Sequence, residues 1–257
     1  MYMNAFTTTI SDIMMMVKRN LIRYTRLPQL IVFSTIQPVM FLLLFTYVFG
    51  GAITTPIAEY IDFLLPGILL QTVLFGSMQT GIALSDDMSR GIIDRFRTLP
   101  MARSAVLAGR TITDSLRNVF VVLLMAGVGA SIGFRFQGSW LAALAALGIA
   151  VLFGFAFSWI SATIGLAVKD TETAQVAGFI WIFPLAFASS IFVPIESMPK
   201  YLEAFARWSP VTVTVDTIRA LSLGQPVGDS LWYSLAWIVG ILIIFIPLAV
   251  WQYRRRV

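Results

Sequence analysis

Six long stretches without a charged side chain constrain this chain more than any other feature of its sequence. An ionised group at the centre of a bilayer costs a few kcal/mol or more, and a membrane-spanning helix needs about 20 apolar residues. The charge-free windows run over 27–58, 63–85, 118–134, 136–168, 173–195 and 230–253. Within them we expect spans near 30–50, 64–84, 117–134, 141–167, 174–193 and 231–251. The windows therefore predict an all-α membrane protein, with one domain of six transmembrane helices over residues 1–257.

The composition leaves lipid as the solvent for most of the surface. Hydrophobic residues make up 58% of the chain and charged residues 12%, whereas an ordinary soluble domain has about 45–50% and about 25%. The sequence also has no Cys and no His. Their absence excludes disulfides, thiol nucleophiles, most zinc sites and a histidine general base. We therefore expect no hydrolytic catalysis, no metal site and no cofactor bound directly to this chain.

The distribution of Lys and Arg predicts the orientation of the chain. Fourteen of the 18 basic residues lie before the first predicted span, in the second and fourth loops, or in the C-terminal tail. Because basic loops stay on the cytoplasmic side, both termini should be cytoplasmic and the protein should lie in the plasma or inner membrane. The basic residues flank apolar runs, so the net charge of +5 points to membrane lipids as partners and not to nucleic acid.

The N-terminal segment 1–27 is predicted to form an amphipathic helix on the inner leaflet. Its apolar residues share one helical face: Ile10, Ile13, Met14, Val17 and Leu21. Asp12, Arg19, Arg23 and Arg26 lie on the opposite face. The alternative is a disordered basic tail. A cleaved signal peptide is disfavoured, because its positive charges would precede its apolar core.

Segment 86–100, DDMSRGIIDRFRTLP, follows the second span on the predicted cytoplasmic side. Its apolar residues Met88, Ile92, Phe96 and Leu99 recur at helical spacing. The spacing predicts a short amphipathic helix outside the membrane. Two interpretations fit this pattern equally: a helix resting on lipid headgroups, or a docking helix that fits a groove on a soluble partner.

Segment 194–223, before the last span, is amphipathic and rich in proline but too short to cross the membrane. Pro199 can open a helix that Pro210 ends. One interpretation is a re-entrant helix in the outer leaflet, and the other is an interfacial loop anchored by Tyr201 and Trp208. In the first, an outer gate would contain Phe192, Pro194, Met198 and Pro199. Asp216 and Arg219, three residues apart, are placed to pair.

Three glutamines within the predicted spans should point away from lipid: Gln37, Gln71 and Gln79. They can form hydrogen bonds between helices, or they can line a substrate pathway. Gly129 and Gly133 have the GxxxG spacing of close-packed helices. The charge-free windows contain no carboxylate that could relay a proton or cation, which disfavours an ion-coupled secondary transporter.

Three stretches resemble type-2 ABC exporter permeases. Asp87, Gly91, Asp94 and Pro100 match the acidic-x-x-x-Gly-x-x-acidic-x-x-x-x-x-Pro pattern of the family's first cytoplasmic loop, with Asp87 where the family usually has Glu. Residues 60–71, YIDFLLPGILLQ, resemble the start of the family's second span, and residues 192–221 resemble its outer segment. The resemblance extends over nearly the whole chain. It is closest to the daunorubicin-resistance subgroup of multidrug and lipid exporters.

The resemblance implies a permease that pairs with a second copy or a homologue and with cytoplasmic ATPase subunits, which would bind ATP and Mg. It assigns the ATPase contact to the loop residues Asp87, Arg90, Gly91, Ile92, Asp94, Phe96 and Pro100. The implied cargo is a hydrophobic or amphipathic drug or lipid. The chain has no Gly-x-x-x-x-Gly-Lys-Ser/Thr string, so no nucleotide site of its own is expected. A glycan or ion exporter of the same fold and a non-transporting membrane scaffold are alternatives.

Overall fold

The computed structural model describes residues 5–26, 28–53, 55, 57, 59–97 and 103–256. This part of the chain consists of helices and connecting segments, with no β-strand. In chain order the elements are α1 (Ala5–Arg26), α2 (Pro28–Leu44), the π-helical η1 (Phe45–Phe49), α3 (Tyr60–Ser89), α4 (Ile92–Arg97), α5 (Arg103–Ser131), α6 (Trp140–Ala167), α7 (Thr171–Phe187), the 3-10 turn η2 (Ile195–Ser197), α8 (Lys200–Trp208), α9 (Pro210–Ser222) and α10 (Ser230–Arg256).

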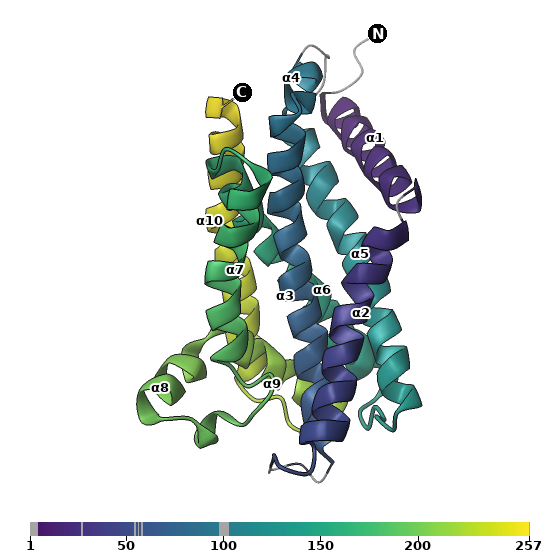
Figure 1. Ribbon diagram of the computed structural model, residues 1–257, viewed down its shortest axis with the longest axis vertical. Helices are drawn as coiled ribbons and strands as arrows, with labels where there is room; N and C mark the ends of the chain where they lie inside the picture. The colour runs from purple at the N-terminus through teal and green to yellow at the C-terminus, as the bar shows by residue number, and fades with distance from the viewer. Residues whose placement is uncertain are drawn as a thin grey trace.

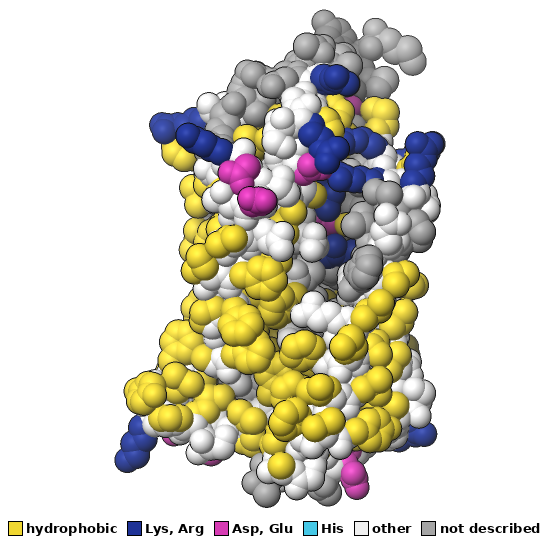
Figure 2. Space-filling view, viewed as in Figure 1, with side chains coloured by type: hydrophobic (Ala, Val, Ile, Leu, Met, Phe, Trp, Pro, Cys, Tyr) yellow, Lys and Arg dark blue, Asp and Glu magenta, His cyan; other side chains and the backbone are white. Residues whose placement is uncertain are grey.

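The long helices run along the length of one bundle (Figure 1). Helices α1 and α4 and the C-terminal end of α10 lie at one end of the bundle, while α8 and α9 lie at the other. On the face shown in Figure 2, hydrophobic side chains form a broad belt, and most Lys and Arg side chains gather at the end that carries α1 and α4. Large apolar residues are exposed in the described part of the chain, for example Ile180 (69%) and Ile243 (68%). Exposed apolar surface of this extent indicates hydrocarbon as the surrounding medium.

The predicted helical membrane domain is confirmed. Among the described residues, four helices are long and apolar enough to cross a membrane: α3, α6, most of α10 and the part of α5 from Ala105 to Ser131. The stretch Ser34–Phe49 is apolar but shorter, and α7 has 17 residues. The predicted span at 174–193 is longer than α7, which ends at Phe187, and α5 begins well before the predicted span at 117–134.

Short polar side chains begin three of the helices. Ser139 accepts a hydrogen bond from the amide of Ala142 at the start of α6, and Ser209 caps α9 in the same way. Asp170 accepts from the amide of Thr173 at 2.8 Å, which satisfies a backbone donor at the start of α7. This bond stabilises the carboxylate and holds the pKa of Asp170 below its usual range.

Helix α3 forms the centre of the bundle, since 83% of its most apolar window is buried. It crosses α6 at Gly81 and Gly165, where the two backbones touch: a Cβ atom on Gly165 would overlap the carbonyl group of Gly81. The glycines thus let the helices approach closely. The prediction that Gly129 and Gly133 together form a close-packed helical face was wrong. Gly133 lies beyond the end of α5 with φ of 118°, and the space beside Gly129 holds the side chain of Leu65.

Two local predictions are corrected by the packing of α1 and α4. α1 does not rest on lipid alone, because Met16, Val17 and Tyr24 are buried within the protein. Segment 86–100 is not one helix: α3 continues to Ser89, the chain turns at Gly91, and α4 follows. The φ of Gly91 is 65°, a left-handed conformation that an α-helix cannot contain and that glycine adopts without steric cost.

Candidate functional site

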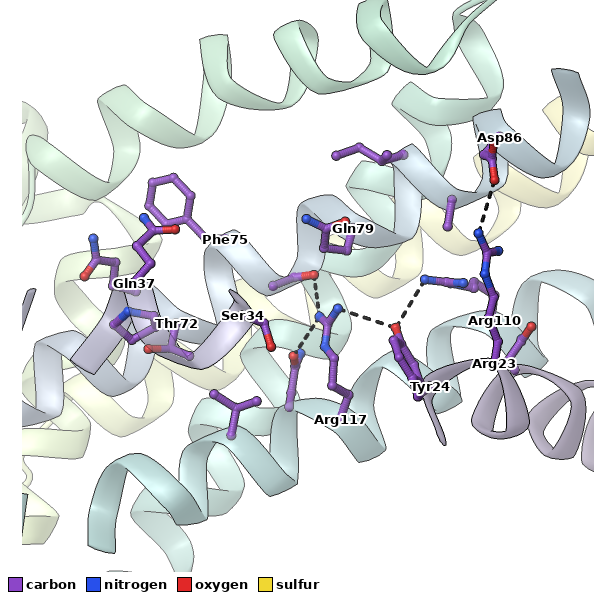
Figure 3. Close-up of a pocket in the computed structure, with 18 of the residues that line it drawn as sticks. Arg23, Tyr24, Ser34, Gln37, Thr72, Phe75, Gln79, Asp86, Arg110 and Arg117 are labelled. Carbon is purple, nitrogen blue, oxygen red and sulfur yellow. Dashed lines mark hydrogen bonds and ion pairs between the residues drawn. The ribbon is translucent and has the colours of Figure 1, made fainter. Parts of the chain in front are cut away.

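A cavity of about 450 Å³ lies between α1, α2, α3, α5 and the first residue of α7 (Figure 3). Its wall combines three kinds of side chain. The charged residues are Arg23, Asp86, Arg110 and Arg117; the main polar ones are Tyr24, Ser34, Gln37, Gln71, Thr72, Gln79 and Asn118; the apolar ones include Pro38, Phe41, Phe75, Ile82 and Val121. The volume is that of a small-molecule site, and the lining is amphipathic.

The cavity brings together the three glutamines singled out in the sequence. Gln37 comes from α2, and Gln71 and Gln79 come from α3, and all three line its wall. Gln71 is 4% exposed, whereas Gln37 and Gln79 are accessible to solvent. The placement suits contact with a bound molecule as well as bonding between helices, so their role in a substrate pathway stays a prediction.

A buried carboxylate, Asp114 on α5, organises the charged end of the cavity. Its Oδ2 accepts hydrogen bonds from Arg110 Nε at 2.9 Å and from the hydroxyl of Thr80 at 2.6 Å. Its Oδ1 accepts from the hydroxyl of Tyr24 at 2.7 Å. Asp114 thereby joins α5 to α1 and α3, and it is inaccessible to solvent. All three donors point at the carboxylate oxygens, which suits a structural role in holding these helices together.

Arg117 lies one turn further along α5 and faces the cavity (Figure 3). It donates to the carbonyl oxygen of Gly76 at 2.7 Å, to Asn118 Oδ1 at 3.1 Å and to the hydroxyl of Tyr24 at 3.5 Å. Burial and the adjacent Asp114 raise the pKa of Tyr24 above its ordinary value, so the hydroxyl keeps its proton at neutral pH.

The reading of charge-free windows missed this cluster. The third window begins only at residue 118, which leaves Arg110 in the predicted cytoplasmic loop and Arg117 at the boundary between that loop and the predicted span. In the structure they belong to α5, which begins at Arg103. A signal was present: Arg110, Asp114 and Arg117 recur at spacings of four and three, which puts them on one helical face.

A second group of charges holds α1 to the junction between α3 and α4. Asp86 accepts from Arg23 at 3.2 Å and from Arg90 at 2.7 Å. Asp87, predicted as an ATPase contact, instead lies 3.3 Å from Arg19 and 3.5 Å from Arg23 and is 4% exposed. Two arginines of the basic face predicted for α1, Arg19 and Arg23, therefore bind this junction.

The predicted docking residues that the structure describes differ in what they contact. Met88 and Phe96 pack against buried residues that include Ile93 and Trp159, so the apolar stripe points partly inward. The guanidinium of Arg19 also covers the Phe96 ring, 4.7 Å from its centroid.

The other docking residues differ in exposure. Ile92 is half-exposed and Arg90 is exposed. Gly91 forms the turn between α3 and α4, and Asp94 belongs to α4. Pro100 lies outside the described residues.

The predicted outer-gate residues differ in burial. Phe192 is buried and stacks on Phe45 and Phe187 with ring centroids 4.6 and 5.2 Å apart. Pro194 and Met198 are half-exposed, and Pro199 is exposed at the start of α8.

The predicted pair of Asp216 and Arg219 is confirmed at 2.7 Å. Arg219 also donates to the carbonyl oxygens of Ser190 at 2.8 Å and of Phe63 at 3.1 Å. It thus ties α9 to α3 and to the segment after α7.

Comparisons with known proteins agree over most of the chain. The family model described as ABC-2 type transporter matches residues 11–223. The chain is 33% identical over 252 residues to the "Daunorubicin resistance ABC transporter permease protein DrrB1" of Streptomyces coeruleorubidus, covering 98% of this chain and 89% of the relative. It is 25% identical over 254 residues to the "Probable doxorubicin resistance ABC transporter permease protein DrrC" of Mycobacterium tuberculosis, covering 98% and 91%. It is 24% identical over 216 residues to the "Putative transport permease ycf38" of Cyanophora paradoxa, covering 82% and 74%.

Proposed function

The chain belongs to the ABC-2 type transporter family, and from this membership we propose that it is the membrane permease subunit of an exporter for amphipathic, drug-like compounds. The observation that carries the cargo assignment is the amphipathic cavity, where arginines and glutamines face aromatic side chains. Its lining can take a molecule with one polar end and one apolar end. The names of two relatives, which concern daunorubicin and doxorubicin resistance, support a drug as cargo.

The simplest topology for an exporter here has six crossings of the membrane. The first crossing is α2 together with η1, and the other five are α3, α5, α6, α7 and α10. α7 rises about 25 Å at 1.5 Å per residue, slightly less than a hydrocarbon core of about 30 Å, a mismatch that a local thinning of the bilayer absorbs. The basic end with α1 and α4 would face the cytoplasm. Helices α8 and α9, at the opposite end, would form the outer re-entrant segment.

Cysteine labelling tests this topology directly, because the chain has no native cysteine. Ser89 and Lys200 are exposed at opposite ends of the bundle. A membrane-impermeant maleimide added to intact cells should label Lys200→Cys and leave Ser89→Cys unlabelled until the membrane is opened. Labelling of Lys200→Cys only from the inside would reverse the proposed orientation.

ATP and Mg would be bound by cytoplasmic ATPase subunits, and the permease would work beside a second copy or a homologue. The exposed Arg90 and the half-exposed Ile92, on either side of the turn at Gly91, offer the docking surface on this side. Phe96 would act indirectly by fixing α4 against Arg19 of α1, and Asp87 by fixing α3 against the same helix. Movement of α4 would then be transmitted through α1 to Asp86 and Asp87 of α3, and so to the cavity that α3 lines.

Drug-stimulated ATP hydrolysis by the reconstituted permease and ATPase complex tests the function. We expect daunorubicin to stimulate hydrolysis in the wild-type complex. Ile92→Asp should weaken copurification of the ATPase by about tenfold or more, because it places a charge in an apolar contact. Tyr201→Asp, an equally drastic change at an exposed residue of the opposite end, should leave copurification unchanged. The proposal is wrong if no ATPase associates with the wild-type chain.

A further inference from the structure

The charges at one end of the cavity do not balance. Three arginines line it, Arg23, Arg110 and Arg117, together with one carboxylate, Asp86. Asp86 is engaged by Arg23, and Arg110 is paired with Asp114 just behind the wall. Among the described residues, no carboxylate lies within ion-pairing distance of Arg117. The cavity therefore has an excess of positive charge at this end.

Arg117 is unusual because it is charged, only 7% exposed and bound to neutral groups alone. Its partners are the carbonyl oxygen of Gly76, the amide oxygen of Asn118 and the hydroxyl of Tyr24. Removing a guanidinium from water costs several kcal/mol unless an opposite charge and good hydrogen bonds offset the loss. The nearby carboxylate of Asp114 interacts with Arg117 but is already paired with Arg110, so the two guanidiniums share one buried negative charge. Since Arg117 lines the cavity, an anion bound there would balance the second guanidinium.

The rest of the cavity suits an apolar body attached to that anion. Phe41, Phe75 and Val121 line it as well, and Figure 3 shows Phe75 at a distance from Arg110 and Arg117. We propose that the cavity binds an anionic amphiphile, whose phosphate, sulfonate or carboxylate headgroup is held by Arg117 and whose apolar part packs against the phenylalanines. The planar guanidinium can donate two parallel hydrogen bonds to such a headgroup. The inference rests on the exporter role. It restricts to anionic amphiphiles the class of molecule that the exporter moves or requires as a bound lipid.

Gln79 provides a way to change the charge of the cavity without disturbing its buried network. It lines the cavity, is exposed, and lies one helical turn from Gly76, whose carbonyl oxygen accepts from Arg117. Gln79→Glu introduces a negative charge on this wall and should repel an anionic headgroup. Gln79→Lys is the matched control of opposite sign and should retain or increase its binding.

The test is native mass spectrometry of the purified permease and ATPase complex in mixed micelles with equal amounts of phosphatidylglycerol and phosphatidylcholine. We expect the wild type to retain phosphatidylglycerol about tenfold better, the preference that one charge-assisted contact of about 1.4 kcal/mol provides. Gln79→Glu and Arg117→Gln should lose this preference, while Gln79→Lys keeps it. Excess inorganic phosphate distinguishes the source of the anion: displacement of the lipid indicates a site for the headgroup alone, and its retention indicates that the acyl chains are also bound.

Equal retention of the two lipids by the wild type would overturn the inference, as would an unchanged preference in Gln79→Glu. If Arg117→Gln does not fold, the two Gln79 variants still decide the question. Daunorubicin-stimulated ATP hydrolysis, measured on the same preparations, separates this inference from the exporter role. Stimulation without lipid preference refutes the anionic site alone, and lipid preference without stimulation by any drug refutes drug export alone.

Discussion

Replacing Asp114 with asparagine is expected to destabilise the protein by about 3–5 kcal/mol. The change keeps the size of the side chain but removes the only buried negative charge that Arg110 and Arg117 share among the described residues. An amide also presents donors to a site where Arg110, Thr80 and Tyr24 already donate. The measurement is thermal unfolding of the detergent-purified permease, together with its yield in the membrane.

Two further variants show whether the buried charge is the cause. Asp229→Asn makes the same chemical change at an exposed residue beside α10 and should alter stability by no more than about 0.5 kcal/mol. Arg110→Met combined with Asp114→Leu removes one charge of each sign and should cost less than Asp114→Asn alone, because fewer unpaired charges remain buried. Equal melting of Asp114→Asn and the wild type would show that the pair does not stabilise the bundle.

Gly165→Ala is expected to lower stability by about 2–3 kcal/mol, and Gly165→Val by more. The added Cβ would overlap the backbone of Gly81 on α3, and a backbone cannot move aside as the end of a flexible side chain can. To relieve this overlap, α6 would have to move away from α3, the helix at the centre of the bundle. Thermal unfolding of the purified variants measures the loss.

The matched control lies on the same helix. Gly148→Ala introduces the same methyl group at a position of α6 with no atom within 4 Å of the new Cβ. It should be neutral or stabilising by up to about 1 kcal/mol, because alanine favours the helix over glycine. If Gly165→Ala were tolerated as well as Gly148→Ala, the close crossing of α3 and α6 could not be as tight as the structure has it.

The helical segments could be predicted from the sequence because their cause is local. A run of about 20 apolar residues must leave water and satisfy its own backbone whatever its neighbours are. The spans expected near 64–84, 141–167 and 231–251 therefore lie entirely within α3, α6 and α10. The helix ends could not be predicted where charged residues lie inside a helix, as Arg110 and Asp114 do in α5. Such residues lower the hydropathy of a window to the level of a loop.

Only part of the candidate site could be predicted from the sequence. The glutamines could be found in the sequence because an uncharged polar group is conspicuous in an apolar run, and all three line the cavity. The buried network at the charged end of the cavity could not be found in this way, because Tyr24, Thr80 and Asp114 meet from three helices. Hydropathy and periodicity describe one helix at a time and contain no information on which faces meet.

What the sequence by itself determined is the solvent: lipid around a bundle of helices, with the basic residues gathered toward one end. Tertiary structure alone decided that α1 packs on α5 and that the acidic residues after the second span bind the arginines of α1. It also decided that a buried arginine, with no ion-pairing carboxylate among the described residues, faces the cavity. The physical reason is the range of the forces. Transfer of a segment into lipid depends on the segment's own residues, whereas ion pairs and cavities depend on distances between helices that only the packed bundle sets.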